Sequence, residues 1–386
     1  MKLGELIEIK HGYAFSGEHI VEDDNGIVLV TPGNFRIGGG FKEEKCKFFD
    51  GEIPADYVLK EGDFIVTMTD LSKTIDTLGY SALVPKSKRT YLHNQRIGLV
   101  TFKSDECDRG YIYWLMRTRE YQRSIANTST GATVHHTSPK KIYDYDLEVP
   151  PLPIQHRIAT ILSRYDSLIE NYQKQIKLLE EAAQRLYKEW FVDLRFPGHE
   201  NTNIIDGVPE GWEKKSVDSI YNIKYGKNLS TKLITETGFY PVYGANGVIG
   251  YYDKANCNEQ VVLITSRGNG SGDVLMTYHK DAFITNNSFI VTPSEGFEYC
   301  KLPFTFQFLK MANFRAVRTG AAQPQLTNQS IHTVDVILPN KNLIEKFCSA
   351  TIGMNDTIIK YREQIRLLTE ARDRLLPKLM SGAIEV

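Results

Sequence analysis

Two long stretches of the chain carry apolar residues at alternating steps of four and three, the heptad pattern of paired helices. From residue 158 to residue 186 the pattern predicts a helix about 42 Å long, and a helix of that length needs a partner. Thr351 and Arg372 interrupt the second stripe. The first stripe is Ile158, Leu162, Tyr165, Ile169, Tyr172, Ile176, Leu179, Ala183, Leu186 and Trp190. The second is Phe347, Thr351, Met354, Ile358, Tyr361, Ile365, Leu368, Arg372, Leu375 and Leu379.

The remaining segments have short β-branched or aromatic runs separated by Gly, Asn and Asp, which predict twisted, mostly antiparallel strands. Helices are expected at residues 111–125 and 303–312. The predicted fold class is α+β, with two mostly β globular domains alternating with two long helices. The predicted divisions are 1–148 for the first domain, 149–196 for the first helix, 197–337 for a linker with the second domain, and 338–386 for the second helix.

One module occurs twice. Residues 172–186 and 361–375 share nine of fifteen positions at an offset of 189, where unrelated segments would share about one. The same offset pairs Gly131-Ala132 with Gly320-Ala321, whereas residues 9–12 resemble residues 223–226 at an offset of 214. Two such copies tend to pack about a pseudo-twofold axis. We therefore expect the helices to form an antiparallel coiled coil with a domain at each end.

Composition indicates an ordinary globular protein, with 41% hydrophobic and 24% charged residues among 386 and a net charge of -1. No apolar run approaches the roughly 20 residues of a membrane span, and the start of the chain does not resemble a signal peptide. The five cysteines form no Cys-x-x-Cys pair, so free thiols are expected. These features favour a cytoplasmic location.

Local charge points to a polyanionic partner, because clustered Lys and Arg bind phosphates by displacing counterions. Residues 109–143 contain six basic residues and one acid, and the aligned residues 299–334 contain four basic residues and no acid. The alternative is a solvated face. Polar loops beside these stretches carry Arg, Asn and Gln, which read guanine and adenine in the major groove. The candidate DNA-binding residues are Lys86, Lys88, Arg89, Asn94, Gln95, Arg96, Arg117, Arg119, Arg123, His135, His136, Lys140, Lys141, Arg267, Asn286, Asn287, Lys310, Arg315, Arg318, Gln323 and Gln325.

Signatures of catalysis are missing from the sequence. It contains no Asn/Asp-Pro-Pro-Tyr/Phe loop of amine methyltransferases and no phosphate-binding loop of ATPases. The Gly-rich segment 268–272 opens no evident helix and is expected to be a tight turn. His135-His136 has no further ligands at metal-binding spacing. We therefore expect no catalytic residue, no metal and no cofactor in this chain.

The order of these segments resembles the specificity subunit of type I restriction-modification systems, over nearly the whole length. The similar segments are the Pro-rich entry at 149–155, the repeated helices, the Pro-x-Gly-Trp sequence ending at Trp212, the Met-Thr-Asp strand end at Asp70, Asn94-Gln95-Arg96 and Thr319-Gly320-Ala321. The first domain lacks a Gly-Trp entrance. Such subunits are built as target-recognition domain, helix, target-recognition domain, helix.

The resemblance implies a non-catalytic DNA-recognition subunit. Each domain would read half of an asymmetric bipartite target in double-stranded DNA, and the helices would set the spacer. Two methyltransferase subunits would dock on the helices and methylate adenine with S-adenosylmethionine, and restriction subunits, ATP-dependent translocases and nucleases, would use ATP and Mg. No membrane partner is implied.

A broad apolar stripe on the helices indicates that more than two helices pack together. The candidate partner-binding residues outside the seam are Leu168, Leu178, Ala182, Tyr187, Leu367, Ala371 and Leu376. The alternative for these positions is packing on the protein's own domains. Two other functions remain open: the specificity subunit of a related system whose partner fuses methyltransferase and nuclease, and a coiled-coil scaffold that binds proteins.

Overall fold

The computed structural model describes residues 1–44, 46–103, 105–320 and 323–386. Ala321, which belongs to the Thr319-Gly320-Ala321 segment discussed above, lies outside the described residues. The chain divides into two compact units. Unit 1 contains residues 1–169 and 367–386, and unit 2 contains residues 170–366.

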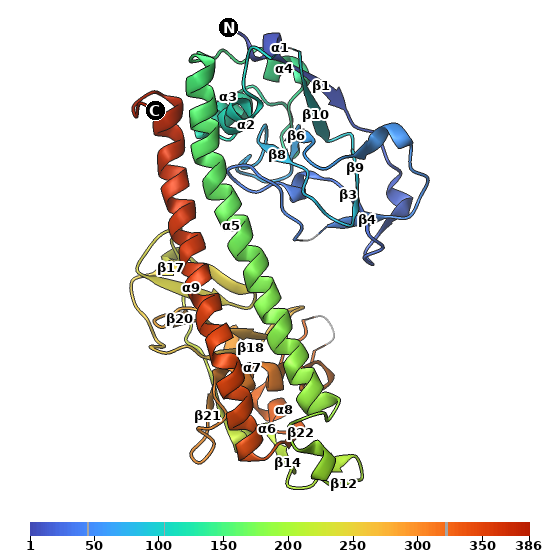
Figure 1. The fold of residues 1–386 in the computed structure, drawn as a ribbon, viewed down its shortest axis with the longest axis vertical. Coiled ribbons are helices and arrows are strands. Elements are labelled where there is room, and N and C mark those ends of the chain that lie inside the picture. The colour runs from blue at the N-terminus through green and yellow to red at the C-terminus, as the bar shows by residue number, and fades with distance from the viewer. Residues whose placement is uncertain (45, 104, 321–322) are drawn as a thin grey trace. The chain divides into compact units, whose positions relative to one another are not determined.

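The two long helices are α5 (Leu152–Tyr187) and α9 (Lys341–Met380), drawn in green and red in Figure 1. They begin at equivalent positions of the repeat, because 341 minus 152 is 189. Asn340 caps α9 by accepting a hydrogen bond from the Leu343 amide at 2.9 Å. After α5 the chain makes a π-turn, η4 (Lys188–Val192), in which the Asp193 amide donates to the Lys188 carbonyl at 2.8 Å.

The helices run antiparallel within each unit. In unit 1, Ile158 and Leu162 of α5 share a core with Leu376 and Leu379 of α9. In unit 2, Tyr172 stacks on its own repeat equivalent, Tyr361, with ring centroids 4.8 Å apart. Further along α5 in unit 2, Tyr187 meets the earlier residue Phe347 of α9. Equivalent residues that meet across the pair are expected where two copies of one helix cross in opposite directions.

The structure accounts for both interruptions of the second apolar stripe. Arg372 reaches across to α5, where its Nη1 donates to Asp166 Oδ1 at 2.6 Å. The other oxygen of Asp166 accepts from Arg117 Nη1 at 2.5 Å, so one carboxylate joins two guanidinium groups. Thr351 is buried and its hydroxyl donates to the Phe347 carbonyl one turn back at 2.8 Å. Both polar side chains are therefore satisfied inside the helix pair.

Unit 1 is built on an antiparallel sheet in the order β1-β10-β6-β8. Helices cover one face of this sheet together with the ends of α5 and α9, and they form a common core. A second sheet has the order β2-β4-β3-β9-β5, of which β4, β3 and β9 are labelled in Figure 1. Strand β11 pairs with β7. The strands are β1 (Ile7–His11), β2 (Ile20–Val21), β3 (Ile27–Leu29), β4 (Lys47–Phe49), β5 (Val58–Leu59), β6 (Phe64–Thr67), β7 (Thr69–Asp70), β8 (Ser81–Leu83), β9 (Thr90–Leu92), β10 (Ile97–Phe102) and β11 (His135–His136); the helices are α1 (Leu3–Leu6), α2 (Arg109–Leu115), α3 (Arg119–Asn127) and α4 (Pro139–Tyr143).

Unit 2 repeats this plan with the sheet β15-β21-β18-β19 and a smaller sheet β17-β16-β20. The pairs β14·β22 and β12·β13 lie beside the end of α5 and the start of α9. The strands are β12 (Ile204–Ile205), β13 (Val208–Pro209), β14 (Glu213–Ser216), β15 (Tyr221–Tyr225), β16 (Tyr240–Gly244), β17 (Gly247–Tyr252), β18 (Val262–Thr265), β19 (Val274–Met276), β20 (Phe283–Ile284), β21 (Ser288–Pro293) and β22 (Asp335–Leu338); the helices are α6 (Val217–Ile220), α7 (Leu302–Met311) and α8 (Asn328–Ile331).

Element positions reproduce both offsets of the repeat. Helix α1 and strand β1 correspond to α6 and β15 at 214 residues, since 217 minus 3 and 221 minus 7 both equal 214. Helix α4 corresponds to α8 at 189 residues, and the two are capped by equivalent hydroxyls, Ser138 and Thr327. The predicted α+β fold with duplicated domains and antiparallel helices is confirmed.

One predicted element differs. The expected helix at 111–125 consists of α2 and α3, separated at residues 116–118. The separation arises because the Thr118 side chain accepts a hydrogen bond from the Tyr121 amide at 3.2 Å and starts a new helix. The apolar spacing continues through the break, so periodicity alone does not reveal it.

The matching glycines near the start of each module sit where no Cβ fits. A Cβ on Gly12 would lie 2.1 Å from the Asn94 carbonyl oxygen, and one on Gly226 would lie 2.3 Å from that of Thr285. The next residue, Tyr13 in unit 1 or Lys227 in unit 2, forms a parallel β-bridge with the residue that carries this oxygen. This close approach fixes the turn that leads into β10 or β21.

We expect Gly12→Ala and Gly226→Ala each to destabilise its own unit by roughly 2 kcal/mol or more, because backbone must move. Gly17→Ala is the matched control, since nothing lies within 4 Å of its added Cβ. Hydrogen exchange of peptides from the two units measures the effect. Equal exchange in Gly12→Ala and Gly17→Ala would contradict the steric argument.

Candidate nucleic-acid interface

In unit 1, hydrogen bonds bring together three polar segments that are distant in the sequence. The Met68 amide donates to the Arg96 carbonyl at 2.9 Å, and the Met68 carbonyl accepts from the Thr137 amide at 3.0 Å. Strand β11, at the end of the polar loop 127–136, pairs with β7, so that His135 lies opposite Asp70 and His136 opposite Thr69. The turn 94–96, the strand end 68–70 and the loop 127–136 therefore form one cluster, in which residues 68–70 are buried.

The loop in this cluster is closed by its own backbone. Thr130 and His136 exchange two hydrogen bonds, of 3.0 and 2.8 Å. Gly131 has φ of +105°, and a Cβ there would lie 2.0 Å from the Val134 carbonyl oxygen. Only glycine fits this turn, which explains why the repeat has glycine at this position.

Unit 2 builds the same cluster with equivalent bonds. The Ser266 amide donates to the Asn287 carbonyl at 2.8 Å, and the Ser266 carbonyl accepts from the Leu326 amide at 2.8 Å. Thr319 and Gln325 exchange bonds of 2.9 and 2.8 Å. Gly320 has φ of +85°, so it adopts a positive φ like its repeat equivalent Gly131. The polar loops predicted from the two halves are thus brought to one place in each unit.

A buried carboxylate shapes the next loop of unit 1. Asp70 is 2% exposed and accepts hydrogen bonds from the amides of Ser72, Thr77 and Leu78 and from the Thr77 hydroxyl, at 2.6 to 3.1 Å. Ile75 in this loop has φ of +55°, a strained value for a β-branched residue, and its carbonyl accepts from Gln122 at 2.6 Å. Asp70 therefore holds residues 71–78 beside the cluster.

The pKa of Asp70 makes this loop sensitive to acid. Burial alone would raise the pKa of its carboxyl group, but the hydrogen bonds from Ser72 and Thr77 outweigh burial and lower the pKa below the ordinary value of 3.8. Because the folded pKa is depressed, the stabilisation is present above the unfolded pKa and is lost as pH falls through the folded one.

We expect Asp70→Asn to destabilise unit 1 at neutral pH. The difference from wild type should shrink as the pH falls below about 4, where the wild-type carboxyl group also becomes protonated. Urea unfolding at a series of pH values measures this difference. A difference that stays constant down to pH 2 would contradict the assigned role of the ionised carboxylate.

In unit 2 the Gly-rich segment is the connection between β18 and β19. Arg315 donates to Asp273 at 2.6 Å, and Arg318 donates to the carbonyls of Arg315 and Asn269. Within this loop Ser271 is buried, and its hydroxyl donates to the Ser266 carbonyl at 3.3 Å. The Gly268 amide donates to the Pro324 carbonyl at 3.0 Å, so this loop adjoins the cluster of unit 2.

The DNA-binding candidates differ in exposure. The exposed ones are Lys86, Lys88, Gln95, Arg119, Arg123, His136, Lys140, Arg267, Lys310, Arg315, Gln323 and Gln325. The half-buried ones are Arg89, Arg96, His135, Lys141, Asn286, Asn287 and Arg318, and the buried ones are Asn94 and Arg117.

Some of the basic candidates make contacts within the protein itself. Arg117 is 4% exposed, stacks over Trp114 and bonds Asp166, so it supports the fold. Arg89 pairs with Asp24 and Glu43 at the beginning of β9, whereas the 94–96 turn follows the end of that strand. Lys141 donates to the Thr128 carbonyl at the base of the polar loop.

The candidate partner-binding residues on the helices also differ in exposure. Leu178, Leu168 and Leu367 are 63%, 45% and 43% exposed, although they are large apolar side chains on long helices. Ala182 and Ala371 are half-buried. Tyr187 and Leu376 belong to the cores of units 2 and 1, so these two pack on the protein's own domains.

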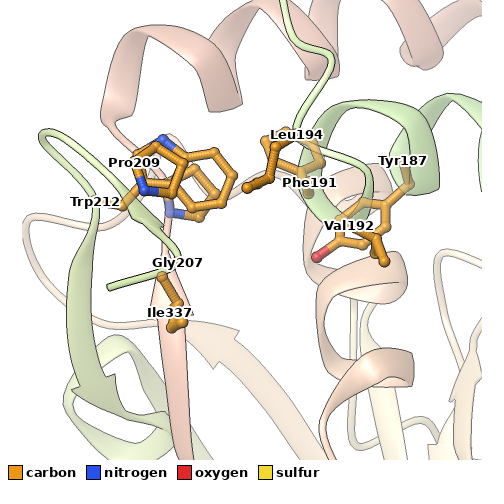
Figure 2. Close-up of a pocket in the computed structure, with 9 residues that line it drawn as sticks. Tyr187, Phe191, Val192, Leu194, Gly207, Pro209, Trp212 and Ile337 are labelled. Carbon is orange, nitrogen blue, oxygen red and sulfur yellow. The ribbon is translucent and has the colours of Figure 1, made fainter. Parts of the chain in front are cut away.

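Tyr187 also lines a cavity of about 160 Å³ in unit 2, which Figure 2 shows beside Phe191, Leu194 and Trp212. Trp212 packs against Phe191 and Phe196 with ring centroids 6.0 and 5.6 Å apart. The Pro-x-Gly-Trp segment thus anchors the entrance of the second domain to the end of α5.

Across the described ranges, no group of three or more His, Cys, Asp or Glu residues is placed to hold a metal ion. No helix in the described part of the chain has the length and apolar character needed to cross a membrane.

Several positioning residues were not found from the sequence. Asp166 and Ser266 act through tertiary contacts that leave no local pattern, whereas Thr69 and Asp70 belong to the Met-Thr-Asp strand end, to which the sequence assigned no role. Gly12 was detectable, because it matches Gly226 in the repeat, but its steric reason becomes visible only with the opposing strand in place.

Comparison with known proteins agrees with this organisation. The model of the family described as "Type I restriction modification DNA specificity domain" matches residues 1–181 and 209–362. The type I restriction enzyme MjaIX specificity subunit of Methanocaldococcus jannaschii is 27% identical over 303 residues, which are 72% of this chain and 69% of that protein. The putative MjaX specificity subunit of the same organism is 28% identical over 351 residues, 86% of this chain and 80% of that protein.

A solved structure has the same fold. The type I restriction-modification system S subunit from M. genitalium superposes with a TM-score of 0.57 at 18% sequence identity. The match covers 98% of this chain and 95% of that one.

Proposed function

Because the chain belongs to the family of type I restriction-modification DNA specificity domains, we propose that its two domains read the two halves of an asymmetric bipartite DNA target. The observation that carries the proposal is the duplicated cluster of polar loops. Its backbone bonds are the same in both units, whereas its side chains differ. Equal scaffolds with unequal side chains suit a target whose two halves have different sequences.

We assign residues 1–148 and 197–337 as the recognition domains and the segments 149–196 and 338–386 as the spacer helices. Exposed cations near the clusters would contact phosphates, which fix position, and the loop side chains would contact base edges in the major groove. Arg117 is left out of this set because it is buried in an ion pair. Asn94 is buried as well and would act on the turn rather than on DNA.

The exposed leucines Leu168, Leu178 and Leu367 support docking of partner helices, since apolar side chains on a helix surface are stabilised when a partner covers them. The proposed partners are two methyltransferase subunits, which would bring S-adenosylmethionine, and restriction subunits, which would bring ATP and Mg. In this account the chain supplies recognition and no catalytic group.

Selection of the purified full chain on duplex DNA with a randomised interior tests recognition. The proposal predicts enrichment of one motif made of two different short blocks separated by an unspecified spacer of fixed length. Binding that depends on salt but enriches no motif would contradict it, because phosphate contacts alone carry no sequence information.

A further inference from the structure

The equivalent bonds of the two clusters identify positions that the sequence alone does not align. Met68 and Ser266 make the same pair of backbone bonds, so the residues that follow them, Thr69 and Arg267, are equivalent. His136 and Gln325 are equivalent through the repeat, since 325 minus 136 is 189. Thr69 lies opposite His136, and Arg267 lies opposite Gln325, each in an antiparallel pair.

Residues directly opposite in an antiparallel pair place their side chains on the same face. In unit 2, Arg267 and Gln325 are both exposed, and within the described residues neither side chain has a hydrogen-bond partner. An arginine side chain can make two hydrogen bonds to guanine, and a glutamine side chain can make two hydrogen bonds to adenine.

In unit 1 the same two positions have a different chemistry. Thr69 is buried, and its hydroxyl is hydrogen-bonded to His136 Nδ1 at 3.1 Å. This contact orients the exposed imidazole and leaves Nε2 without a partner in the part of the chain that the structure describes. Unit 1 therefore presents a single oriented ring where unit 2 presents two long polar side chains.

We propose that these two opposed positions determine base identity in each half-site, with Arg267 reading a guanine and Gln325 reading a neighbouring adenine in the half read by unit 2. The other half is read through His136, which Thr69 positions. This inference rests on the proposed function and adds to it the residues that make the two halves different.

The account predicts which base each substitution selects. Arg267→Gln should change the preference at one position from guanine to adenine, and Gln325→Glu should change the next from adenine to cytosine, whose amino group needs an acceptor. His136→Gln should change one position of the other block to adenine. Loss of one bidentate contact should lower discrimination at its position by roughly 5- to 150-fold.

The experiment repeats the selection on randomised duplex DNA with wild type, the three variants and Lys310→Gln as the matched control. Lys310 is an exposed cation of unit 2, and its loss should weaken binding to all sequences equally. Each variant is first compared with wild type by thermal unfolding. All three replaced side chains are exposed, so each variant is expected to unfold at the same temperature as wild type.

The expected result is a change at one position of one block for each variant, with the other block and the spacer length unchanged. An unchanged motif in Arg267→Gln and Gln325→Glu would overturn the inference. So would a natively folded variant that binds but has lost its motif entirely or changed it in the opposite block. If wild type itself enriches no motif, the proposed function fails instead, and the two failures are thereby distinguished.

Discussion

Asp166→Ala is expected to destabilise unit 1 by about 3 kcal/mol or more, because it leaves two guanidinium groups inside the protein without their shared carboxylate. The side chains of Arg117 and Arg372 are 3% and 15% exposed, and Asp166 bonds both. Burial by itself would lower the pKa of the Arg372 guanidinium group, but the neighbouring Asp166 carboxylate outweighs burial and raises it. Removing one partner of a buried pair costs more than the pair contributes.

Hydrogen exchange resolved by peptide measures this effect in each unit separately. Peptides of α2 and of the first half of α5 should lose protection by 100-fold or more, since 1.4 kcal/mol is a factor of ten, whereas unit 2 keeps its protection. Glu181→Ala is the matched control on the same helix, because its pair with Arg185 is exposed and is worth little. An equal effect of the two substitutions would show that the Asp166 network does not stabilise unit 1.

Leu178→Glu and Leu367→Glu are each expected to abolish co-purification of the proposed methyltransferase partner while the chain itself stays folded. These leucines are equivalent in the repeat, since 367 minus 178 is 189, and both are exposed. A charge on an exposed position costs the fold little, but burying it without a partner in an interface costs several kcal/mol.

Co-expression with the methyltransferase followed by affinity purification measures retention of the complex. Gln184→Glu provides the control, because it adds the same charge at an exposed polar position of α5. Retention of the partner by both leucine variants would place the docking surface elsewhere. Loss of the partner in the control as well would mean that charge on α5, rather than these apolar contacts, decides binding.

The architecture was largely predictable from the sequence because it depends on patterns that repeat. The apolar stripes gave the helices, and the two offsets gave the duplicated elements, so that even the first residues of α5 and α9 correspond. The break between α2 and α3 was missed because Thr118 ends a helix by a single side-chain bond without disturbing the apolar spacing.

The cluster was predictable only in part. The polar loops beside the basic stretches were expected from the sequence. Residues 127–136 lie in the cluster of unit 1, and residues 318–320 and 323–325 lie in that of unit 2. The equivalence of Thr69 with Arg267 could not be read from the sequence, because the offset of the repeat changes from 214 to 189 between its matching segments. Contacts across the sheet establish the match. Arg117 shows an error of the opposite kind. It lies in a basic stretch and was therefore a DNA-binding candidate, but the structure buries it in an ion pair.

The most direct test of the central claim compares the adenine-methylation map of the host genome with and without this gene. The account predicts that deletion removes methylation at one asymmetric motif of two short blocks with a fixed spacer, and that restoring the gene restores it. A map in which every methylated motif survives the deletion would contradict the assignment of this chain as the subunit that directs modification to its target.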